Sequence, residues 1–195
     1  MWCTSRCDVP QGSVLGPLLF IIYINDIVNT SSVLNYVLFA DDTNLFSSHT
    51  NLDTLINILN KELDKVSNRL KVNKLSLNIK KTHFILFHNK QKLINNKINI
   101  NMDNSEIEQV FSTKFLGVII NENLTWSDHT CVLLNKTSKN LGVIRKLSKT
   151  LPLDILHSLY NTLIDPYLQY CNIAWATCST SSVDKLFRMQ KLLFK

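Results

Sequence analysis

"NYVLFADDTNLF" (Asn35–Phe46) carries the clearest local signal in this chain of 195 residues. An apolar run leads to two adjacent carboxylates, Asp41 and Asp42, and a second short run follows them. Two strand-like runs around a polar pair predict a β-hairpin over residues 36–47 with a tight turn at its tip. Aspartates suit such a turn on conformational grounds alone, because their side chains hydrogen-bond the nearby backbone. The rest of the chain must explain why two like charges occupy the tip.

The composition indicates a packed protein with a mild preference for anionic partners. Hydrophobic residues make up 45% of the chain and charged residues 18%, which excludes a disordered, highly charged chain. The 21 Lys and Arg residues exceed the 15 Asp and Glu residues, and the net charge of +6 favours a partner such as nucleic acid. Basic residues gather at positions 136–149 and 185–195, although solvated helix faces explain such runs equally well.

The sequence offers no pattern for secretion, membrane insertion or zinc binding. The longest apolar run, Val14–Ile24, is too short to cross a bilayer and contains Gly16 and Pro17. The N-terminus does not resemble a signal peptide, so we expect an intracellular protein, nuclear or cytoplasmic, without a membrane partner. The five cysteines are odd in number and the five histidines are scattered, which predicts reduced thiols and no zinc site.

Helical and strand patterns alternate irregularly before residue 125. We expect a buried helix over 10–27 that begins near Gly12–Ser13, and an amphipathic helix over 51–72. The buried seam of the second helix should contain Leu55, Leu59, Leu63 and Val66, and its outer face Lys61, Glu62, Asp64, Lys65 and Arg69. Strands are expected at 83–87, 94–101 and 115–120. Because no regular βαβ repeat appears, the predicted fold class is α+β.

Only helical patterns follow Trp126. Ser127 is placed to cap a helix that reaches Leu147, and Pro152 suits the first turn of the next helix. Pro166 should break or kink that helix. A further helix is expected from Ser181, whose hydroxyl stands three residues before Asp184 as in a capping box. We therefore predict a boundary near residue 125, between an α+β part (1–125) and a helical part (126–195).

Five sequence blocks in fixed order resemble the reverse transcriptases of non-LTR retrotransposons. They are "VPQGSVLGPLLFIIYINDI" (Val9–Ile27), "FADDT" (Phe39–Thr43), "NKLSLNIKKTHFILF" (Asn73–Phe87), "FLGVIINENLTW" (Phe115–Trp126) and a tail similar to jockey-like elements, "LPLDILHSLYNTLIDPYLQYCNIAW" (Leu151–Trp175). The resemblance extends from residue 9 to the end of the chain. It implies a partial polymerase palm over 1–125, an antiparallel sheet with packed helices, and a helical, thumb-like region over 126–195.

The resemblance also implies a function for the paired aspartates. An RNA-directed DNA polymerase transfers a nucleotide to the 3′-hydroxyl of a primer with two Mg²⁺ ions, and Asp41 and Asp42 would be metal ligands and catalytic residues. Mg²⁺ prefers oxygen ligands and is typically held by one or two carboxylates plus substrate phosphates. A bound dication would relieve the repulsion between the two adjacent charges. The implied partners are an RNA template, a DNA primer and deoxynucleotides, and the oligomeric state is left open.

Further site residues are carried over from the matching blocks. Gln11, Gly12 and Ser13, with Phe39 and Ala40, would lie at the nucleotide and template, although a simple helix start explains the first three equally well. Lys81 would protonate the leaving pyrophosphate, with the neighbouring Lys80 as the competing candidate and a solvated surface lysine as the alternative. Phe115, Leu116 and Gly117 resemble the hairpin that supports the primer, or they belong to an ordinary core.

Two elements of the family pattern have no counterpart in this sequence. Family members carry another metal-binding aspartate and a fingers region upstream of the "QGS" block, and Asp8 stands where the family usually has glycine. We therefore expect that the chain alone is inactive as a polymerase. The alternative interpretation is a truncated, catalytically inactive retroelement product that acts at most as a nucleic-acid-binding module.

Overall fold

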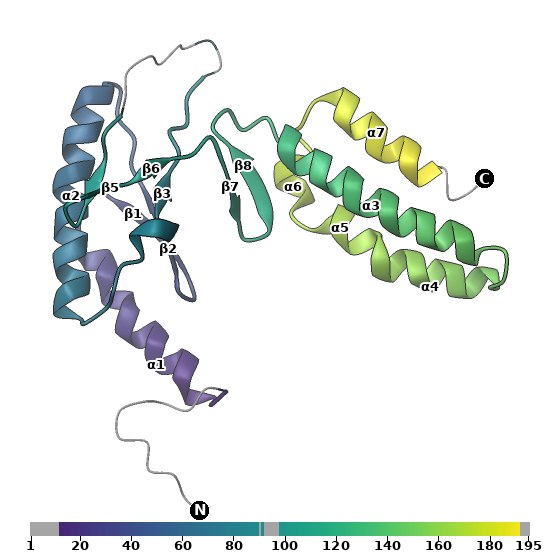
Figure 1. The fold of residues 1–195 in the computed structure, drawn as a ribbon, viewed down its shortest axis with the longest axis horizontal. Helices are drawn as coiled ribbons and strands as arrows, with labels where there is room; N and C mark the ends of the chain where they lie inside the picture. Colours follow the sequence, from purple (N-terminus) through teal and green to yellow (C-terminus); the bar gives the residue numbers. More distant parts are fainter. Residues whose placement is uncertain (1–11, 90, 92–97, 192–195) are drawn as a thin grey trace, which may run out of the picture. The chain divides into compact units, whose positions relative to one another are not determined.

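The computed structural model describes residues 12–89, 91 and 98–191. It divides the chain into two compact units, one formed by Met1–Phe84 and Asn95–Gln109 and the other by Ile85–Ile94 and Val110–Lys195. Each unit combines helices with short paired strands, as the α+β prediction requires (Figure 1). This division rests on spatial contacts and does not test the palm and thumb assignment, which stays a prediction.

The first unit contains two long helices and three pairs of strands. β1 pairs with β2 and β4 with β5 in antiparallel fashion, whereas β3 pairs with β6 in parallel. The elements in chain order are α1 (Leu15–Ile24), η1 (Asn25–Thr30), β1 (Asn35–Phe39), β2 (Asp42–Phe46), α2 (Leu52–Val72), η2 (Ile79–Lys81), β3 (His83–Phe84), β4 (Asn101–Met102), β5 (Ser105–Glu106) and β6 (Glu108–Gln109). The predicted hairpin over 36–47 is confirmed by β1 and β2.

α2 is the amphipathic helix that the apolar spacing predicts. Asn51 caps its N-terminus, because its side-chain Oδ1 accepts a hydrogen bond of 3.0 Å from the Thr54 N–H. Leu55, Leu63 and Val66 are buried, as expected, while Leu59 is only half-buried. The helix packs against η1 and β4. Other buried apolar residues of the unit are Ile24, Ile27, Leu34, Ile98, Ile100, Met102 and Ile107.

The prediction that Glu62 faces solvent is wrong. Its side chain is buried and forms an ion pair of 2.7 Å with Lys65, one turn further along α2. Hydrogen bonds from Lys65 and Ser31 hold the pKa of the Glu62 carboxyl below its ordinary value, against the opposing effect of burial. These bonds help to stabilise the carboxylate between α2 and the segment before β1, although its Oε2 is buried without a hydrogen-bond partner among the described residues. Helical spacing alone could not reveal them.

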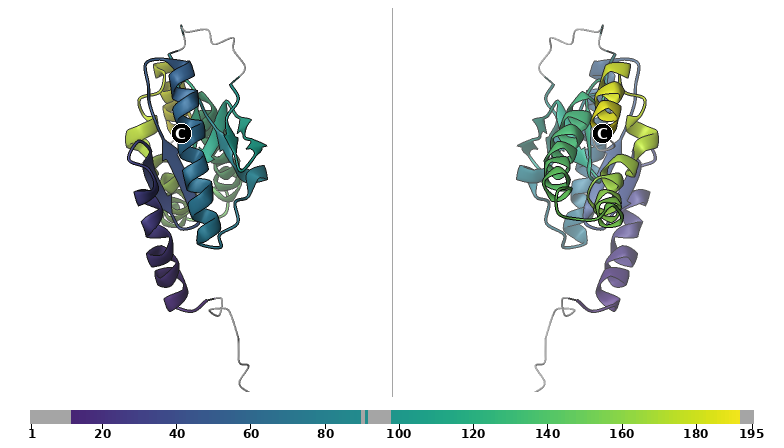
Figure 2. Two further views of the ribbon diagram at one scale, coloured as in Figure 1. Left: turned by 90° about the vertical axis from the view of Figure 1, so that its left-hand side faces the viewer. Right: turned by 90° about the vertical axis from the view of Figure 1, so that its right-hand side faces the viewer.

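α1 is also exposed where we expected a buried helix. Six of its apolar side chains have between 47% and 65% of their surface exposed: Leu15, Leu18, Leu19, Ile21, Ile22 and Tyr23. Its C-terminal end is anchored, because Ile24 is buried, the Tyr23 hydroxyl donates to the Asn73 carbonyl and Asp26 pairs with Arg69. Figure 2 shows α1 projecting past the end of α2. A helix that is apolar on every side is normally covered by other parts of a protein.

The remaining strand predictions were only partly correct. β3 contains two residues of the expected strand 83–87. Residues 94–97 lie outside the described part of the chain, but Ile98 and Ile100 are both buried, in agreement with the predicted alternation. The single strand expected at 115–120 is wrong, because the chain reverses direction within it. Periodicity cannot separate one strand from the two arms of a tight hairpin when both are apolar.

The second unit is built around α3. Its elements are β7 (Ser112–Phe115), β8 (Val118–Asn121), α3 (Ser127–Leu147), α4 (Leu153–Leu163), α5 (Asp165–Gln169), α6 (Asn172–Trp175) and α7 (Thr180–Lys191). β8, α4, α5 and α7 all contact α3. The buried cluster comprises Leu133, Trp175, Leu186 and Met189, with Trp126, Leu134, Leu141 and Leu168 packed around it.

The helix boundaries agree closely with the sequence predictions. α3 spans the expected residues, but the residue that precedes it is Trp126 in a left-handed conformation (φ 60°), so Ser127 is not its N-cap. Pro152 directly precedes α4, and the break between α4 and α5 falls just before Pro166. α7 begins at Thr180, one residue earlier than expected.

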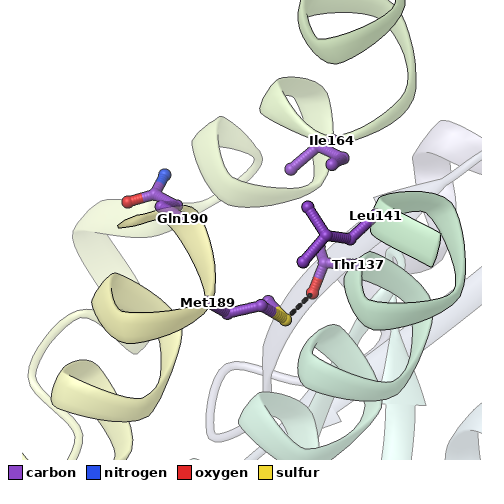
Figure 3. Close-up of a pocket in the computed structure, with 5 residues that line it drawn as sticks. All are labelled: Thr137, Leu141, Ile164, Met189 and Gln190. Carbon is purple, nitrogen blue, oxygen red and sulfur yellow. Dashed lines mark hydrogen bonds between the residues drawn. The ribbon is translucent and has the colours of Figure 1, made fainter. Parts of the chain in front are cut away.

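A polar contact supplements the apolar packing between α3 and α7. Thr137 has no exposed surface, and its hydroxyl lies 2.6 Å from the Leu133 carbonyl oxygen and 3.5 Å from the Met189 sulfur (Figure 3). The Ser138 hydroxyl donates to the same sulfur at 3.0 Å. The gap lined by Thr137, Leu141, Ile164, Met189 and Gln190 is too narrow for a water molecule, so it is a packing seam and not a ligand site.

The burial difference along α2 predicts unequal effects of two identical truncations. Leu63→Ala should lower the free energy of unfolding by about 2 to 5 kcal/mol, because it removes buried methyl groups and leaves a cavity. Leu59→Ala is the matched control, and we expect a clearly smaller loss because this side chain is only half-buried. Urea denaturation followed by circular dichroism would measure both. Equal losses would contradict the described packing of α2.

Candidate functional site

The two aspartates lie at the tip of the β1–β2 hairpin. The register pairs Phe39 with Asp42, so Ala40 and Asp41 form a two-residue turn. Ala40 adopts a left-handed backbone (φ 51°), which costs a residue with a Cβ roughly 1 to 2 kcal/mol. Backbone strain of this kind gathers at functional sites, where the surrounding structure maintains it.

Asp41 and Asp42 are both exposed. Because Asp42 pairs with Phe39, its side chain shares the outer face of the hairpin with Phe39 and Val37, which are also exposed. Tyr36 and Leu38 point to the opposite, half-buried face. No hydrogen bond or ion pair within the described residues engages either carboxylate. Both side chains are therefore available to an external cation.

The donor set at this tip fits a hard divalent cation only in part. Two adjacent carboxylates supply oxygen ligands of the kind that Mg²⁺ prefers. Among residues 12–89, 91 and 98–191, however, no group of three or more Asp, Glu, His or Cys side chains could hold a metal ion. Substrate phosphates or further carboxylates would have to complete the coordination.

The start of α1 satisfies the conformational expectations for the "QGS" block. Gly12 has a φ of +85°, where a side chain is strained, and no atom lies within 4 Å of the position that its Cβ would take. The Ser13 hydroxyl accepts a hydrogen bond of 3.1 Å from the Gly16 N–H, as a helix-capping side chain does. Gln11 lies outside the described residues. Both the nucleotide-binding and the helix-start interpretations therefore remain compatible with this segment.

Lys80 and Lys81 both occupy the short helix η2 and both are exposed. No described hydrogen bond or ion pair joins either side chain to the turn at Asp41 and Asp42. The assignment of Lys81 as the proton donor, with Lys80 as its competitor, stays a prediction. The same holds for the nucleotide-side roles of Phe39 and Ala40.

The "FLG" segment forms the turn of the β7–β8 hairpin in the second unit. Phe115 pairs with Val118, so Leu116 and Gly117 are the two turn residues, with φ values of 44° and 87°. Positive φ at both positions is the mark of a type I′ turn, which matches the twist of antiparallel strands. The space beside Gly117 is also limited, since an added Cβ would lie 3.3 Å from Cε1 of Tyr170, which is closer than an ordinary van der Waals contact.

Two hydrogen bonds join this hairpin to the helices of its unit. The Tyr170 hydroxyl donates to the Leu116 carbonyl at 2.6 Å, and the Ile119 N–H donates to Nδ1 of His129 at 3.3 Å. His129 is buried, and its ring centroid lies 6.1 Å from that of Trp175. Burial and the nearby charge of Lys136 lower the pKa of His129. The neutral ring with its proton on Nε2 is therefore the form that accepts the bond.

Basic side chains occupy the solvent sides of α3 and α7. At about 100° per residue, the buried residues of α3 centre on one side of the helix, and Lys139 and Lys146 lie on the opposite side. On α7, Leu186 and Met189 are buried, whereas Lys185, Arg188 and Lys191 are exposed. Residues 127–191 contain eight Lys and Arg against four Asp and Glu. Both a nucleic-acid surface and an ordinary solvated face fit this arrangement.

Comparison with known proteins decides the family. The model of the family "Reverse transcriptase (RNA-dependent DNA polymerase)" matches residues 2–120, which include the β1–β2 hairpin and the "FLG" turn. The chain belongs to the reverse transcriptase family. Over an alignment 204 positions long, it is 25% identical to the RNA-directed DNA polymerase from mobile element jockey of Drosophila funebris. That alignment covers 97% of this chain and 22% of the relative.

The predicted resemblance to non-LTR reverse transcriptases of the jockey type is therefore confirmed. The chain spans about a fifth of the length of its jockey relative. No solved structure is significantly similar to this reverse transcriptase chain. Within the described residues no helix is long and apolar enough to cross a membrane.

Sequence reasoning missed the residues that hold the "FLG" turn. Tyr170 stands 54 residues after Leu116, and no spacing rule connects a turn to a tyrosine so distant in the chain. The scattered histidines gave no reason to single out His129, and only the structure shows that its Nδ1 accepts a hydrogen bond from the Ile119 N–H. The tail block contained Tyr170 and Trp175 but assigned them no role. A contact between the tail and the "FLG" block was thus outside the reach of the sequence.

The lowered pKa of His129 predicts a pH dependence of stability. The unfolded chain takes up a proton near the ordinary histidine pKa of about 6.5, whereas the folded chain resists it. The contribution of His129 is therefore fully present above about pH 6.5 and is lost as the pH falls toward the folded-state pKa. Thermal unfolding at pH 5 and pH 7.5 would measure it. His129→Asn keeps an acceptor for the Ile119 N–H and should lose less stability at pH 5 than the wild type, so equal losses would contradict this assignment.

Proposed function

We propose that this chain supplies the metal-binding hairpin and the primer-side region of an RNA-directed DNA polymerase. The observation that carries the proposal is the exposed, unpartnered pair Asp41 and Asp42 at a strained two-residue turn, in a chain of the reverse transcriptase family. In the proposed reaction the oxygen of a primer 3′-hydroxyl forms a bond to the α-phosphorus of a deoxynucleotide. The bond between that phosphorus and the departing pyrophosphate breaks.

Asp41 and Asp42 would hold the ions that this transfer needs. Two Mg²⁺ ions, when bound, would lower the pKa of the 3′-hydroxyl and stabilise the charge of the pyrophosphate. The two carboxylates would contribute oxygen ligands, and substrate phosphates and a carboxylate from elsewhere in the polymerase would complete the set. The hairpin supports this role, because its two-residue turn places Asp41 next to Asp42, the first residue of β2, and leaves both carboxylates exposed.

The other site residues would bind and orient the substrates. Gly12 leaves space at the start of α1 for a base or sugar to approach the backbone, and the free N–H groups there favour phosphate. Lys81, or alternatively Lys80, would hold the proton for the leaving pyrophosphate. The β7–β8 turn would support the primer strand. In this proposal residues 1–125 are part of the palm and residues 126–195 form the thumb-like region.

The basic sides of α3 and α7 would contact the template–primer duplex. Exposed lysines and arginines at Lys139, Lys146, Lys185 and Arg188 can neutralise backbone phosphates without reading base sequence. Their position opposite the buried faces of both helices supports the proposal, because such contacts would leave the core of the unit undisturbed.

A second candidate function is nucleic-acid binding without catalysis. It is favoured by the absence, among the described residues, of a third potential ligand beside Asp41 and Asp42. Under this alternative the chain would bind duplexes through α3 and α7 and would never extend a primer. The two candidates share the duplex-binding surface and differ only in the hairpin chemistry.

Binding to a template–primer duplex should weaken steeply with added salt, because each phosphate contact releases a counterion. In a fluorescence anisotropy titration, the double variant Lys185→Gln/Arg188→Gln should reduce the slope of log K against log salt by about two. The matched control Lys61→Gln/Lys74→Gln removes the same charge from exposed sites of the other unit and should leave the slope nearly unchanged. Salt-insensitive binding, or equal effects of the two double variants, would reject the proposed surface.

Primer extension separates the two candidate functions. We expect the 195-residue chain alone to show no extension, because the described residues place no third potential metal ligand beside Asp41 and Asp42. A chimera that supplies the upstream part of the jockey polymerase before this chain should extend a primer on an RNA template when Mg²⁺ is present. Asp41→Asn in the chimera should reduce the rate by at least about 100-fold, because the amide keeps the shape but removes the charge.

Asp53→Asn is the matched control for that experiment. Asp53 is an exposed aspartate in the first turn of α2, and its replacement should leave extension intact. Undiminished extension by the Asp41→Asn chimera would show that the metal site is elsewhere. Extension by the 195-residue chain alone would refute the expectation that its metal site is incomplete.

A further inference from the structure

We propose that Tyr170 is a positioning residue for the primer end, because it fixes the turn of the β7–β8 hairpin. This inference rests on the proposed function, in which that hairpin supports the primer. Tyr170 would not touch the reacting atoms. It would act through the backbone of Leu116 and Gly117, which it contacts directly.

The turn needs external support because its first residue is poorly suited to it. Type I′ turns favour Asn or Gly at positive φ, yet position 116 carries leucine at φ 44°. A leucine side chain can offer the backbone no hydrogen bond, unlike asparagine. Left-handed residues of this kind persist only where the surrounding structure constrains them. The constraint must therefore come from outside the hairpin.

Tyr170 provides that constraint at both turn residues. Its hydroxyl donates to the Leu116 carbonyl at 2.6 Å, and its ring lies where a Cβ on residue 117 would be only 3.3 Å from Cε1. The phenol thus holds one peptide group of the turn while its ring closely approaches the next residue. A turn of different shape would lose the hydrogen bond.

Tyr170 is itself held by the core of the unit. The Trp175 indole N–H donates to the Tyr170 carbonyl at 2.8 Å, and Trp175 belongs to the buried cluster with Leu133. Between them Cys171 takes a left-handed backbone (φ 51°), which reverses the chain between α5 and α6. The tyrosine is therefore a short, rigid connection from the core to the turn.

The bond from Ile119 to His129 attaches β8 close to the same turn. With Leu116 held by Tyr170 and Ile119 held by His129, the hairpin is attached at two points to residues that pack on one core. The hairpin then cannot rotate without disturbing that core. A primer strand supported by this turn would have its 3′ end placed by the helices of the second unit, through Tyr170.

Tyr170→Phe tests the proposal, because it removes the hydroxyl and keeps the ring. Tyr167→Phe is the matched control: Tyr167 lies in α5, three residues before Tyr170, under the ammonium of Lys136. Hydrogen exchange of the full 195-residue chain should become about five-fold faster or more at residues 116–121 in Tyr170→Phe. It should be unchanged in Tyr167→Phe and, in both variants, at α2. Unchanged exchange in Tyr170→Phe would overturn the proposal.

A second measurement uses a primer with 2-aminopurine at its 3′ end. A general loss of stability would not by itself change the fluorescence of this base in the bound complex. Both variants should bind the template–primer duplex with wild-type affinity by anisotropy, since the basic side chains are intact. Only Tyr170→Phe should lose the 2-aminopurine fluorescence change seen with the wild type. A wild-type fluorescence change in Tyr170→Phe would overturn the role at the primer end.

The two measurements also separate this inference from the proposed function. If the wild type binds no duplex, the proposed function fails and the primer role of Tyr170 fails with it, whatever the exchange rates. If the wild type binds and shifts the fluorescence but Tyr170→Phe behaves identically in both measurements, only the Tyr170 inference fails.

Discussion

A two-residue turn between twisted antiparallel strands requires left-handed backbone at its tip, and both candidate functional motifs depend on this constraint. In the β1–β2 hairpin it falls on Ala40, directly before the aspartate pair. In the β7–β8 hairpin it falls on Leu116 and Gly117. Alanine and leucine are unfavourable there because their Cβ crowds the carbonyl oxygen. Each hairpin therefore keeps its tip sharp at a cost in stability.

The two hairpins differ in what compensates that cost. The β7–β8 turn accepts a hydrogen bond from the Tyr170 hydroxyl, and the Ile119 N–H of β8 donates one to His129, so contacts with the helical part of its own unit determine the position of this hairpin. At the β1–β2 tip no described hydrogen bond or ion pair involves the carboxylate of Asp41 or Asp42, and both side chains are exposed. A cation at the proposed metal site would act on a tip that the described residues leave unsupported. The tip of the β1–β2 hairpin is accordingly accessible to a ligand, whereas the β7–β8 hairpin is fixed by hydrogen bonds to its own unit.

Like the tip of the β1–β2 hairpin, most of α1 is exposed and has few contacts with the rest of its unit. Its apolar side chains are uncovered along most of the helix, although the Asp26–Arg69 pair and Ile24 secure its end. Exposed apolar surface of this extent normally marks an interface.

The sequence by itself determined the elements whose causes are local. Apolar spacing placed α2 and α3, proline placed the breaks before α4 and at α5, and the "FADDT" pattern placed the first hairpin. The family could also be recognised from the sequence, because the blocks that identify it are defined by the identity and order of their residues and not by packing. Each of these features follows from residues close together in the chain.

Only the tertiary structure decided the features that depend on distant partners. Glu62 is buried with Lys65 and the distant Ser31 stabilising its carboxylate, and α1 is exposed because no described element covers it. The apolar run at 115–120 became a hairpin rather than a strand, with Tyr170 54 residues further on to hold its turn. The periodicity of a sequence shows which residues are apolar. To predict a hydrogen bond or the burial of a surface, one must also know where the partner residues lie. That position exists only once the chain has folded.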